Sequence, residues 1–433
     1  MGEKLEESKK SNGLKDLANK YKKIRKKYDS LNAFIEANNP WKGKDFDDLL
    51  DDFLEVLKKD DKEFSWLKID NGLYNELKDK NGRAASIDYG IPSHVRGDIE
   101  KGTVFLCLVN PNIDVKVAMC EACQMKNEED IKKYIFNPGS EGGILYKEIL
   151  ELKGMKKLIG LKESDEDKNH EKNEIGYYTA NYFNVILLAI NDYKNKDEKE
   201  YEDLKKAVKS FKRFTRTLKN DDENKQKNYK NIKKEDLENF VNISKKIVNL
   251  EAFPFRSSTP NFAIDEDNAK DRFANCLVNS NSNVSMLSAR IIIWKILEYI
   301  VNPKDNVKPV FIFRRFNRAW RPSIENVLKK DFFEKNKDDS VKEDKDDSVK
   351  EDKAINIAID NIINELHEEF FYTIGPKDHD NMLKMSKNIY KDDVNMYKEY
   401  KEEEYKEKEN DRKNKKEVFN KLIIDALSLP KNN

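Results

Sequence analysis

The sequence predicts an α/β fold, a three-layer sandwich in which a short, mainly parallel four-stranded sheet lies between helices, with helical additions at both ends. Short apolar runs alternate with segments of helical periodicity, a pattern typical of a parallel sheet. Each run passes directly into a polar or aromatic turn. Charged residues make up 38% of the chain and hydrophobic residues another 38%, which favours one large, heavily decorated core domain. The expected strands are residues 104–109, 247–250, 310–313 and 370–374.

The chain divides into three parts on its composition. Residues 1–87 are predicted to form a helical N-terminal flank, residues 88–380 the α/β core, and residues 381–433 a charged helical C-terminal extension. The predicted charged insertions in the core are residues 163–174, 191–236 and 331–353. Apolar residues at helical spacing predict two amphipathic helices in the flank, over residues 14–38 and 45–59.

Helices are also expected between the strands. Periodicity or a long apolar stretch predicts them at residues 128–135, 144–152, 177–190, 284–300 and 354–369. The glycine-containing segment FNPGSEGG (136–143) precedes the second of these helices. It is either a plain turn and cap or a helix start whose free N–H groups hold an anion. The octapeptide KDDSVKED occurs twice in tandem, at 337–344 and 345–352, and is interpreted as a solvent-exposed insertion.

Composition excludes several classes of function. Lys plus Arg and Asp plus Glu both number 82, so only a local patch could attract a polyanion. No stretch is apolar over the roughly 18 residues of a membrane span and the N-terminus lacks a signal core, so we expect a cytoplasmic protein without membrane contact. Four cysteines do not make a disulfide framework. Cys120 and Cys123 form half a zinc site at most, and no metal or cofactor is predicted.

The order of the strand-and-turn blocks carries a family resemblance. The blocks are PSHVRGDIEKGTVFLCLVNPN, NLEAFPFRS, a long apolar helix followed by VFIFRRFNRAW, and FFYTIGPKDHD. This order resembles the uracil-DNA glycosylase-like superfamily, and within it the Asn-Pro-Gly branch and related uncharacterised proteins, with large charged insertions added. The resemblance covers about 150 residues between positions 88 and 380. Asn112 stands where that branch has glycine, and the fourth turn lacks the branch's His-Pro-Ser motif.

The resemblance implies a role for each turn. Asn110, after the first strand, would orient a water molecule, and Pro111 and Asn112 would complete its binding turn. Asn249 matches the position that reads a base edge. Phe253 or Phe255 would supply an aromatic platform. His379 would donate a hydrogen bond to the leaving base. Because Asn110 is an amide rather than a carboxylate, this set contains no strong base.

An arginine cluster follows the third strand. RRFNRAWRPS contains Arg314, Arg315, Arg318 and Arg321 beside Phe316 and Trp320. Arginines interleaved with aromatics suit phosphate contacts and base stacking, and Arg256 is expected at the same edge of the sheet. The alternative is that the arginines pair with the many acidic residues and that Trp320 packs in the core.

Two functions of different classes follow from these residues. The first is a glycosylase-like hydrolase that recognises a base in DNA or a nucleotide and cleaves an N-glycosidic bond with a water positioned by Asn110. The second is a non-catalytic module that binds a nucleotide or nucleic acid at the same pocket, with a protein partner on the charged helices. A third outcome is an interaction protein of unrelated α/β fold, which would follow if the four runs did not share one sheet.

Overall fold

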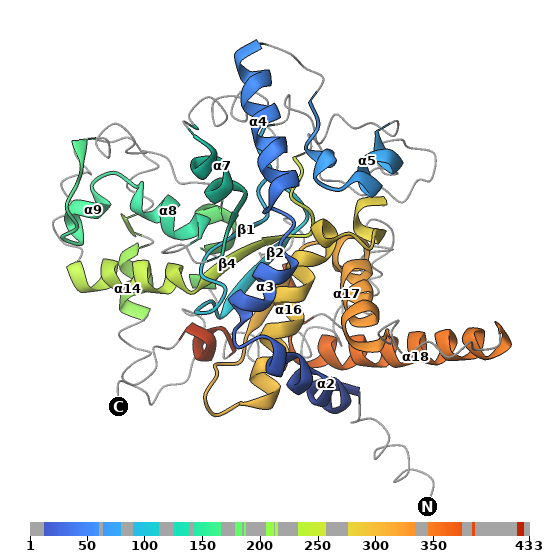
Figure 1. The fold of residues 1–433 in the computed structure, drawn as a ribbon. Helices are drawn as coiled ribbons and strands as arrows, with labels where there is room; N and C mark the ends of the chain where they lie inside the picture. The colour runs from blue at the N-terminus through green and yellow to red at the C-terminus, as the bar shows by residue number, and fades with distance from the viewer. Residues whose placement is uncertain are drawn as a thin grey trace, which may run out of the picture.

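The computed structural model gives the backbone and side chains of most of the expected core. It describes residues 13–59, 64–78, 90–111, 125, 127–138, 143–165, 178–183, 186–187, 205–211, 213–214, 233–256, 276–334, 345–374, 383–385 and 422–427. The fold is α/β, with one mixed sheet (Figure 1).

The four apolar runs are neighbouring parallel strands of this sheet. They are β2 (Val104–Leu108), β4 (Ile247–Glu251), β5 (Val310–Phe313) and β6 (Phe371–Ile374). In the sheet they lie in the order β4, β2, β5, β6, so β2 is flanked by β4 and β5. Every residue of β2, β4 and β5 is buried, as expected for the centre of a sheet covered on both faces.

The sheet has seven strands rather than the four expected. The additional strands are β1 (Val95–Arg96), β3 (Phe136–Asn137) and β7 (Leu383–Met385). β1 runs antiparallel to β4 and parallel to β3, and β7 runs antiparallel to β6. All three are two or three residues long, too short to show an alternating pattern in the sequence.

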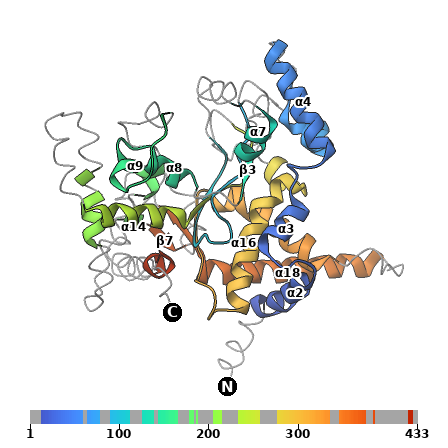
Figure 2. The same cartoon turned by 60° about the vertical axis from the view of Figure 1, so that its left-hand side comes forward.

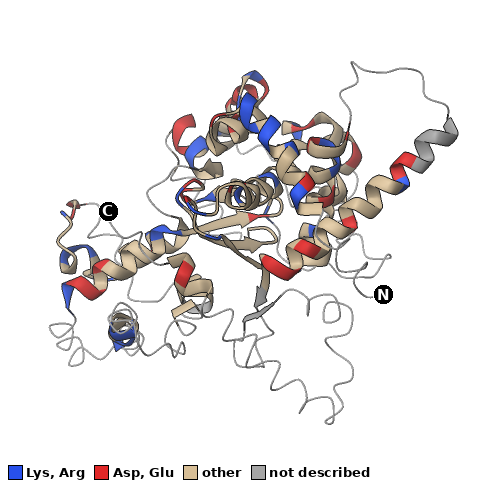
Figure 3. Ribbon diagram, turned by 90° about the horizontal axis from the view of Figure 1, so that it is seen from below, with Lys and Arg blue, Asp and Glu red and all other residues tan. Residues whose placement is uncertain are grey.

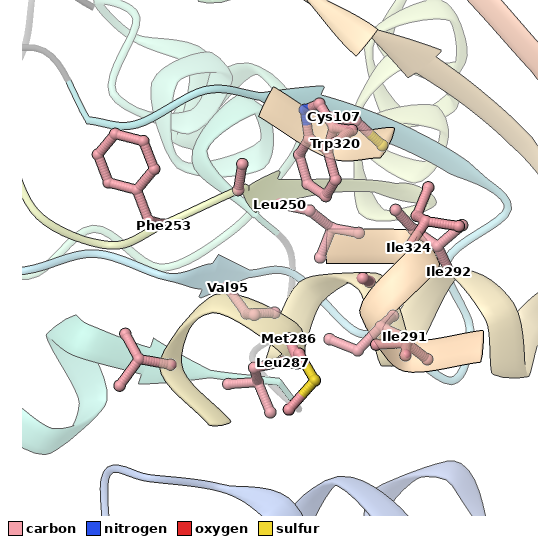
Figure 4. Close-up of a cluster of buried hydrophobic side chains, with 14 of the residues drawn as sticks. Val95, Cys107, Leu250, Phe253, Met286, Leu287, Ile291, Ile292, Trp320 and Ile324 are labelled. Atoms are coloured by element: carbon pink, nitrogen blue, oxygen red, sulfur yellow. The ribbon is translucent and has the colours of Figure 1, made fainter. Parts of the chain in front are cut away.

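One face of the sheet packs on α16 (Asn283–Val301). Its apolar side chains meet Phe105 and Cys107 of β2 and Val248 and Leu250 of β4. Figure 4 shows Met286, Leu287, Ile291 and Ile292 of α16 in this cluster with Val95, Cys107 and Leu250. Burial on all sides explains why α16 is apolar nearly all round.

The opposite face packs on a second set of helices. Val104, Leu106 and Leu108 of β2 meet a separate core cluster on this side. It is formed by α8 (Ile144–Leu150), α9 (Met155–Leu158), η4 (Thr179–Phe183), α14 (Lys234–Lys245) and the helical residues 422–427. Figure 2 shows α8 and α14 on the opposite side of the sheet from α16, α3 and α2.

The N-terminal flank is part of the first layer. It consists of α2 (Gly13–Lys27), α3 (Leu31–Asn38), α4 (Lys44–Lys59), η1 (Trp66–Ile69) and α5 (Asn71–Leu77). The helix expected over 14–38 is two helices, because Ser30 caps α3 by accepting a hydrogen bond from the N–H of Ala33 at 3.1 Å. Phe34 stacks on Trp294 of α16 with ring centroids 4.7 Å apart. The flank therefore shares the core of the α/β domain.

Gly143, the last residue of the glycine-containing segment, lies close to the backbone of two strands at the start of α8. A Cβ atom at this position would lie 2.8 Å from the carbonyl oxygen of Arg96 and 3.1 Å from that of Ile247. The glycine thus allows α8 to start against the backbone of β1 and β4. The preceding helix, α7 (Glu128–Ile135), has the predicted bounds.

After β5 the chain forms η6 (Phe316–Trp320), α17 (Arg321–Val327), η7 (Leu328–Phe333) and α18 (Lys345–Glu369). The second octapeptide copy, residues 345–352, begins α18, which projects from the body of the protein (Figure 1). Figure 3 shows acidic and basic residues along this helix, while the sheet is almost free of them. Within the C-terminal extension, residues 422–427 form a helix whose apolar side chains pack into the core, as the amphipathic pattern of residues 418–429 predicts.

Candidate functional site at the carboxyl edge of the sheet

The carboxyl ends of three parallel strands meet at one edge. Beyond the strands, the N–H of Ala252 donates to the carbonyl oxygen of Leu108 at 3.1 Å, and the N–H of Phe253 donates to that of Val109 at 3.2 Å. On the other side of β2, the N–H of Arg314 donates to the carbonyl oxygen of Cys107 at 2.9 Å. The turns after β4 and β5 are therefore fixed against the end of β2. In open α/β sheets, ligands bind at this edge, where successive connections diverge from one strand.

Asn110 occupies the centre of this edge. Its side chain is 6% exposed, and its Nδ2 donates to the carbonyl oxygen of Phe255 at 2.9 Å. This bond fixes the plane of the side-chain amide and joins the turn after β2 to the turn after β4. Pro111, the next residue, is also buried.

Glu251 ends β4 and was not among the residues chosen from the sequence. It is paired in register with Leu108 of β2, so its side chain faces the layer formed by α8, η4 and α14. The side chain is 4% exposed, and its Oε2 atom has no hydrogen-bond partner among the described residues. The main chain is held on both sides, by the carbonyl oxygen of His94 at 3.0 Å and the hydroxyl of Ser288 at 2.7 Å.

The positive charges of three arginines act on the Glu251 carboxyl: Arg256, Arg96 and Arg314. Burial raises the pKa of Glu251 to about 8, although each of the three positive charges acts to lower that pKa. The site therefore contains a carboxyl group that changes protonation near neutral pH, and such groups suit proton transfer.

Tyr134 of α7 holds two of these arginines. The guanidinium of Arg96 lies over the Tyr134 ring, 4.1 Å from its centroid, and donates to the Tyr134 carbonyl oxygen at 3.1 Å. Arg256 donates to the Tyr134 hydroxyl and, through Nε, to the carbonyl oxygen of Ile91 at 2.9 Å. Arg256 is 8% exposed, so it reaches the edge expected from the sequence but is largely buried there.

Tyr178 approaches Glu251 from the helical layer. Burial, followed by the negative charge of Glu251, raises the pKa of the Tyr178 hydroxyl well above its ordinary value. The neighbouring Thr179 donates to Glu148 of α8 through its N–H at 2.9 Å and its hydroxyl at 2.8 Å. These bonds fix the start of η4 beside the site.

His94 lies behind the same edge. Its Nδ1 accepts a hydrogen bond from Nε1 of Trp41 at 3.1 Å, which places the ring proton on Nε2. Burial lowers the pKa of His94 to about 3, so the ring is neutral at physiological pH.

Asn249 is the middle residue of β4, two residues before Glu251, so it does not close the strand as expected. It is 3% exposed and lies in register between Leu106 of β2 and Arg96 of β1. Its Nδ2 has no hydrogen-bond partner among the described residues. Two buried polar groups, two residues apart on one strand, therefore face the same layer.

The expected aromatic platform is wrong for this structure. Phe253 is 2% exposed and Phe255 is fully buried, and both belong to the core cluster on the α16 face. Trp320 is also fully buried and packs edge-on against Phe313 at 5.5 Å, which agrees with the alternative that it packs in the core rather than stacks on a base. Figure 4 shows Phe253 and Trp320 among the aliphatic side chains of that cluster. The position of each of these three side chains is determined by the burial of its large apolar surface.

The turn after β5 places the arginines of the cluster in different surroundings. Arg314 is exposed at the end of β5, and Arg315 is half-buried with φ of 56°. Arg321 lies on α17 and pairs with Glu325 at 2.6 Å and Asp360 at 2.7 Å. Among the cluster residues with described side chains, Arg314 is therefore the one most open to a phosphate group. Asn112, His379 and the side chain of Arg318 lie outside what the structure describes.

Glu251, Arg96 and Tyr178 were missed because they come from three distant segments. The only local signal was an acidic residue directly after a buried strand, in the sequence NLEAFPFR. Within the described residues, no group of three or more His, Cys, Asp and Glu side chains is arranged to hold a metal ion. Likewise, no described helix is both long and apolar enough to cross a membrane.

Comparisons with protein-family models, with curated proteins and with solved structures found no match to this chain.

Proposed function

We propose that this protein recognises a base, in DNA or in a nucleotide, at the carboxyl edge of β2, β4 and β5, and hydrolyses its N-glycosidic bond. The observation that carries the proposal is the position of Asn110. It follows the central strand at the point where the neighbouring connections diverge, and its amide plane is fixed by the bond to Phe255. An amide in this position orients a water molecule toward the sugar carbon.

Charge at the same edge supports a phosphorylated ligand. Arg314 is exposed at the end of β5, directly beside the end of β2. Arginine suits phosphate because its planar guanidinium donates two parallel hydrogen bonds. The net charge of the whole chain is zero, so phosphate recognition depends on this local position.

The test is release of free base from single- and double-stranded oligonucleotides, nucleosides and nucleotides that each carry one defined base, measured by chromatography. Wild-type protein should release base from at least one of them, and Asn110→Ala should abolish the release. Asn38→Ala is the matched control, because Asn38 also donates from its amide to a main-chain carbonyl, that of Phe34 at 2.8 Å, but on α3.

The outcomes separate the two functions. Nucleotide or oligonucleotide binding without release of any base would favour the non-catalytic binding module. Absence of both binding and release would exclude both functions.

A further inference from the structure

Two buried polar side chains on β4 have atoms without partners. They are Asn249, through Nδ2, and Glu251, through Oε2, and no described residue forms a hydrogen bond with either atom. Residues two apart on a strand point to the same face, about 7 Å apart along the chain. A donor and a carboxyl group therefore lie on one face of β4, Glu251 at the strand end that adjoins the turn with Asn110 and Asn249 one step further into the sheet.

Leaving such atoms unpaired has a free-energy cost. Each buried polar atom without a partner costs about 1–3 kcal/mol. Natural folds retain few of these atoms, and each one retained has an explanation such as strain, a catalytic role, or a bound water or ion. Core side chains such as Tyr21, Trp66 and Trp294 also have such atoms, and the pair on β4 differs from them by lying on one strand beside the carboxyl edge. The pair therefore indicates a ligand that accepts a hydrogen bond from Asn249 and exchanges a proton with Glu251.

Charged and titratable groups lie near Glu251 on the neighbouring elements. They are Arg96 on β1, Arg256 after β4, Arg314 after β5 and Tyr178 beside η4. The thiol of Cys107 on β2 lies on the opposite face of the sheet, toward α16, and the charge of Glu251 acts on it from there. The arginines stabilise the carboxylate that remains after the proton has been donated, and burial favours the protonated acid before donation. Both forms of Glu251 are thus supported by their surroundings, as a proton donor that turns over requires.

We propose that Glu251 is the general acid that protonates the departing base, that Asn249 hydrogen-bonds to the edge of that base, and that the substrates are purines with a basic ring nitrogen. This inference rests on the proposed function and specifies its substrate class. A purine leaves a sugar readily only when one of its ring nitrogens is protonated. The base that departs with the electron pair of the broken bond is then neutral.

The step balances as follows. The bond between the sugar carbon and the base nitrogen breaks, and its electron pair goes to the base. The carboxyl proton of Glu251 is transferred to a ring nitrogen of the base, while water oriented by Asn110 attacks the sugar carbon. The water loses one proton, which restores the Glu251 carboxyl directly or through solvent. The products are the neutral base and the hydrolysed sugar, with no oxidation or reduction.

The test uses two oligonucleotides that differ at one position, one with hypoxanthine and one with 7-methylguanine. The methylated base is already cationic and needs no acid to leave. Glu251→Gln should lower hypoxanthine release by about 10²–10⁴-fold, the usual contribution of a general acid. Release of 7-methylguanine, corrected for spontaneous loss, should fall less than tenfold. Asn110→Ala should lower both rates, because it acts on the water.

A pH profile supplies a second readout. Wild-type release of hypoxanthine should decline above about pH 8, where the Glu251 carboxyl loses its proton, and Glu251→Gln should remove this limb. Circular dichroism and a cooperative thermal transition establish that the variant is folded.

Three results would overturn the inference. Equal losses on the two oligonucleotides would show that Glu251 only positions other groups. Release of uracil by wild-type protein without release of any purine would overturn the substrate class and leave the proposed function standing. No release of any base by wild-type protein would overturn both.

Discussion

The side-chain amide of Asn110 donates a hydrogen bond to the main-chain carbonyl oxygen of Phe255, with 2.9 Å between the two atoms. This bond joins the turns after two neighbouring strands, so the orientation of Asn110 and the path of the chain after β4 depend on each other.

Asn110→Asp should therefore destabilise the protein at pH 7. The substitution places a carboxylate oxygen against a carbonyl oxygen, which costs about 1–3 kcal/mol. The folded state raises the pKa of the new carboxyl above its unfolded value of about 3.9. Stability should therefore recover as the pH falls through that raised value. Urea denaturation at pH 7 and pH 5 measures the recovery. Asn71→Asp, exposed at the start of α5, is the control and should change little. Equal loss at both pH values would contradict the prediction.

Arg314→Ala should weaken binding of single-stranded DNA and flatten its salt dependence. Neutralising one phosphate contributes about 0.7 to the slope of log affinity against log salt for a single strand. The measurement is fluorescence anisotropy over a range of salt concentrations. Arg321→Ala is the control, because Glu325 and Asp360 already pair with that guanidinium. An unchanged slope for Arg314→Ala would remove this residue from the binding surface.

Asp331→Asn should destabilise the fold without touching the site. Arg290 of α16 forms two bonds to Asp331 of η7, at 2.7 and 3.0 Å, and its side chain is 2% exposed. Removal of one partner leaves a buried unpaired charge, at a cost of about 3–5 kcal/mol.

The double variant Arg290→Met with Asp331→Leu should lose less stability than Asp331→Asn alone. Denaturant midpoints test both, and the exposed pair Lys58–Glu55 provides the control Glu55→Gln, with a change below about 0.5 kcal/mol.

Stability should fall between pH 6.5 and pH 8 because of Glu251. In this window the carboxyl is ionised in the unfolded chain, while the folded state retains the proton, since burial raises its pKa from 4.5 to about 8. The folded state binds one more proton, so stability decreases by about 1.4 kcal/mol per pH unit.

Below pH 6.5 the neutral His94 contributes the opposite slope, because burial lowers its pKa from 6.5 to about 3. Denaturation curves at several pH values, compared between wild type and Glu251→Gln, isolate the Glu251 contribution. A constant difference between the two proteins across the window would refute it.

The central strands could be predicted because burial on both faces leaves a continuous apolar run, as in Val104–Leu108. The short strands at the edges of the sheet could not, since two residues such as Val95 and Arg96 carry no period. The places of Asn110 and Asn249 in the sheet could be predicted because each lies in or close after such a run. Glu251 was overlooked because its significance depends on Arg96 and Tyr178, which only the folded chain brings near. The predicted aromatic platform was wrong because the folded chain buries Phe253 and Phe255, and burial of their large apolar surfaces stabilises the core.

The tandem octapeptide bears on how this chain tolerates changes in length. Eight residues inserted within a helix advance its faces by about 80°, because each residue turns the helix by 100°. The second copy ends at Asp352, and Ile359 is the first buried residue among those of α18 whose side chains the structure describes. Duplication upstream of that residue leaves the phase of the packed face unchanged. This point in the chain can therefore gain or lose a unit during replication without altering the domain it adjoins.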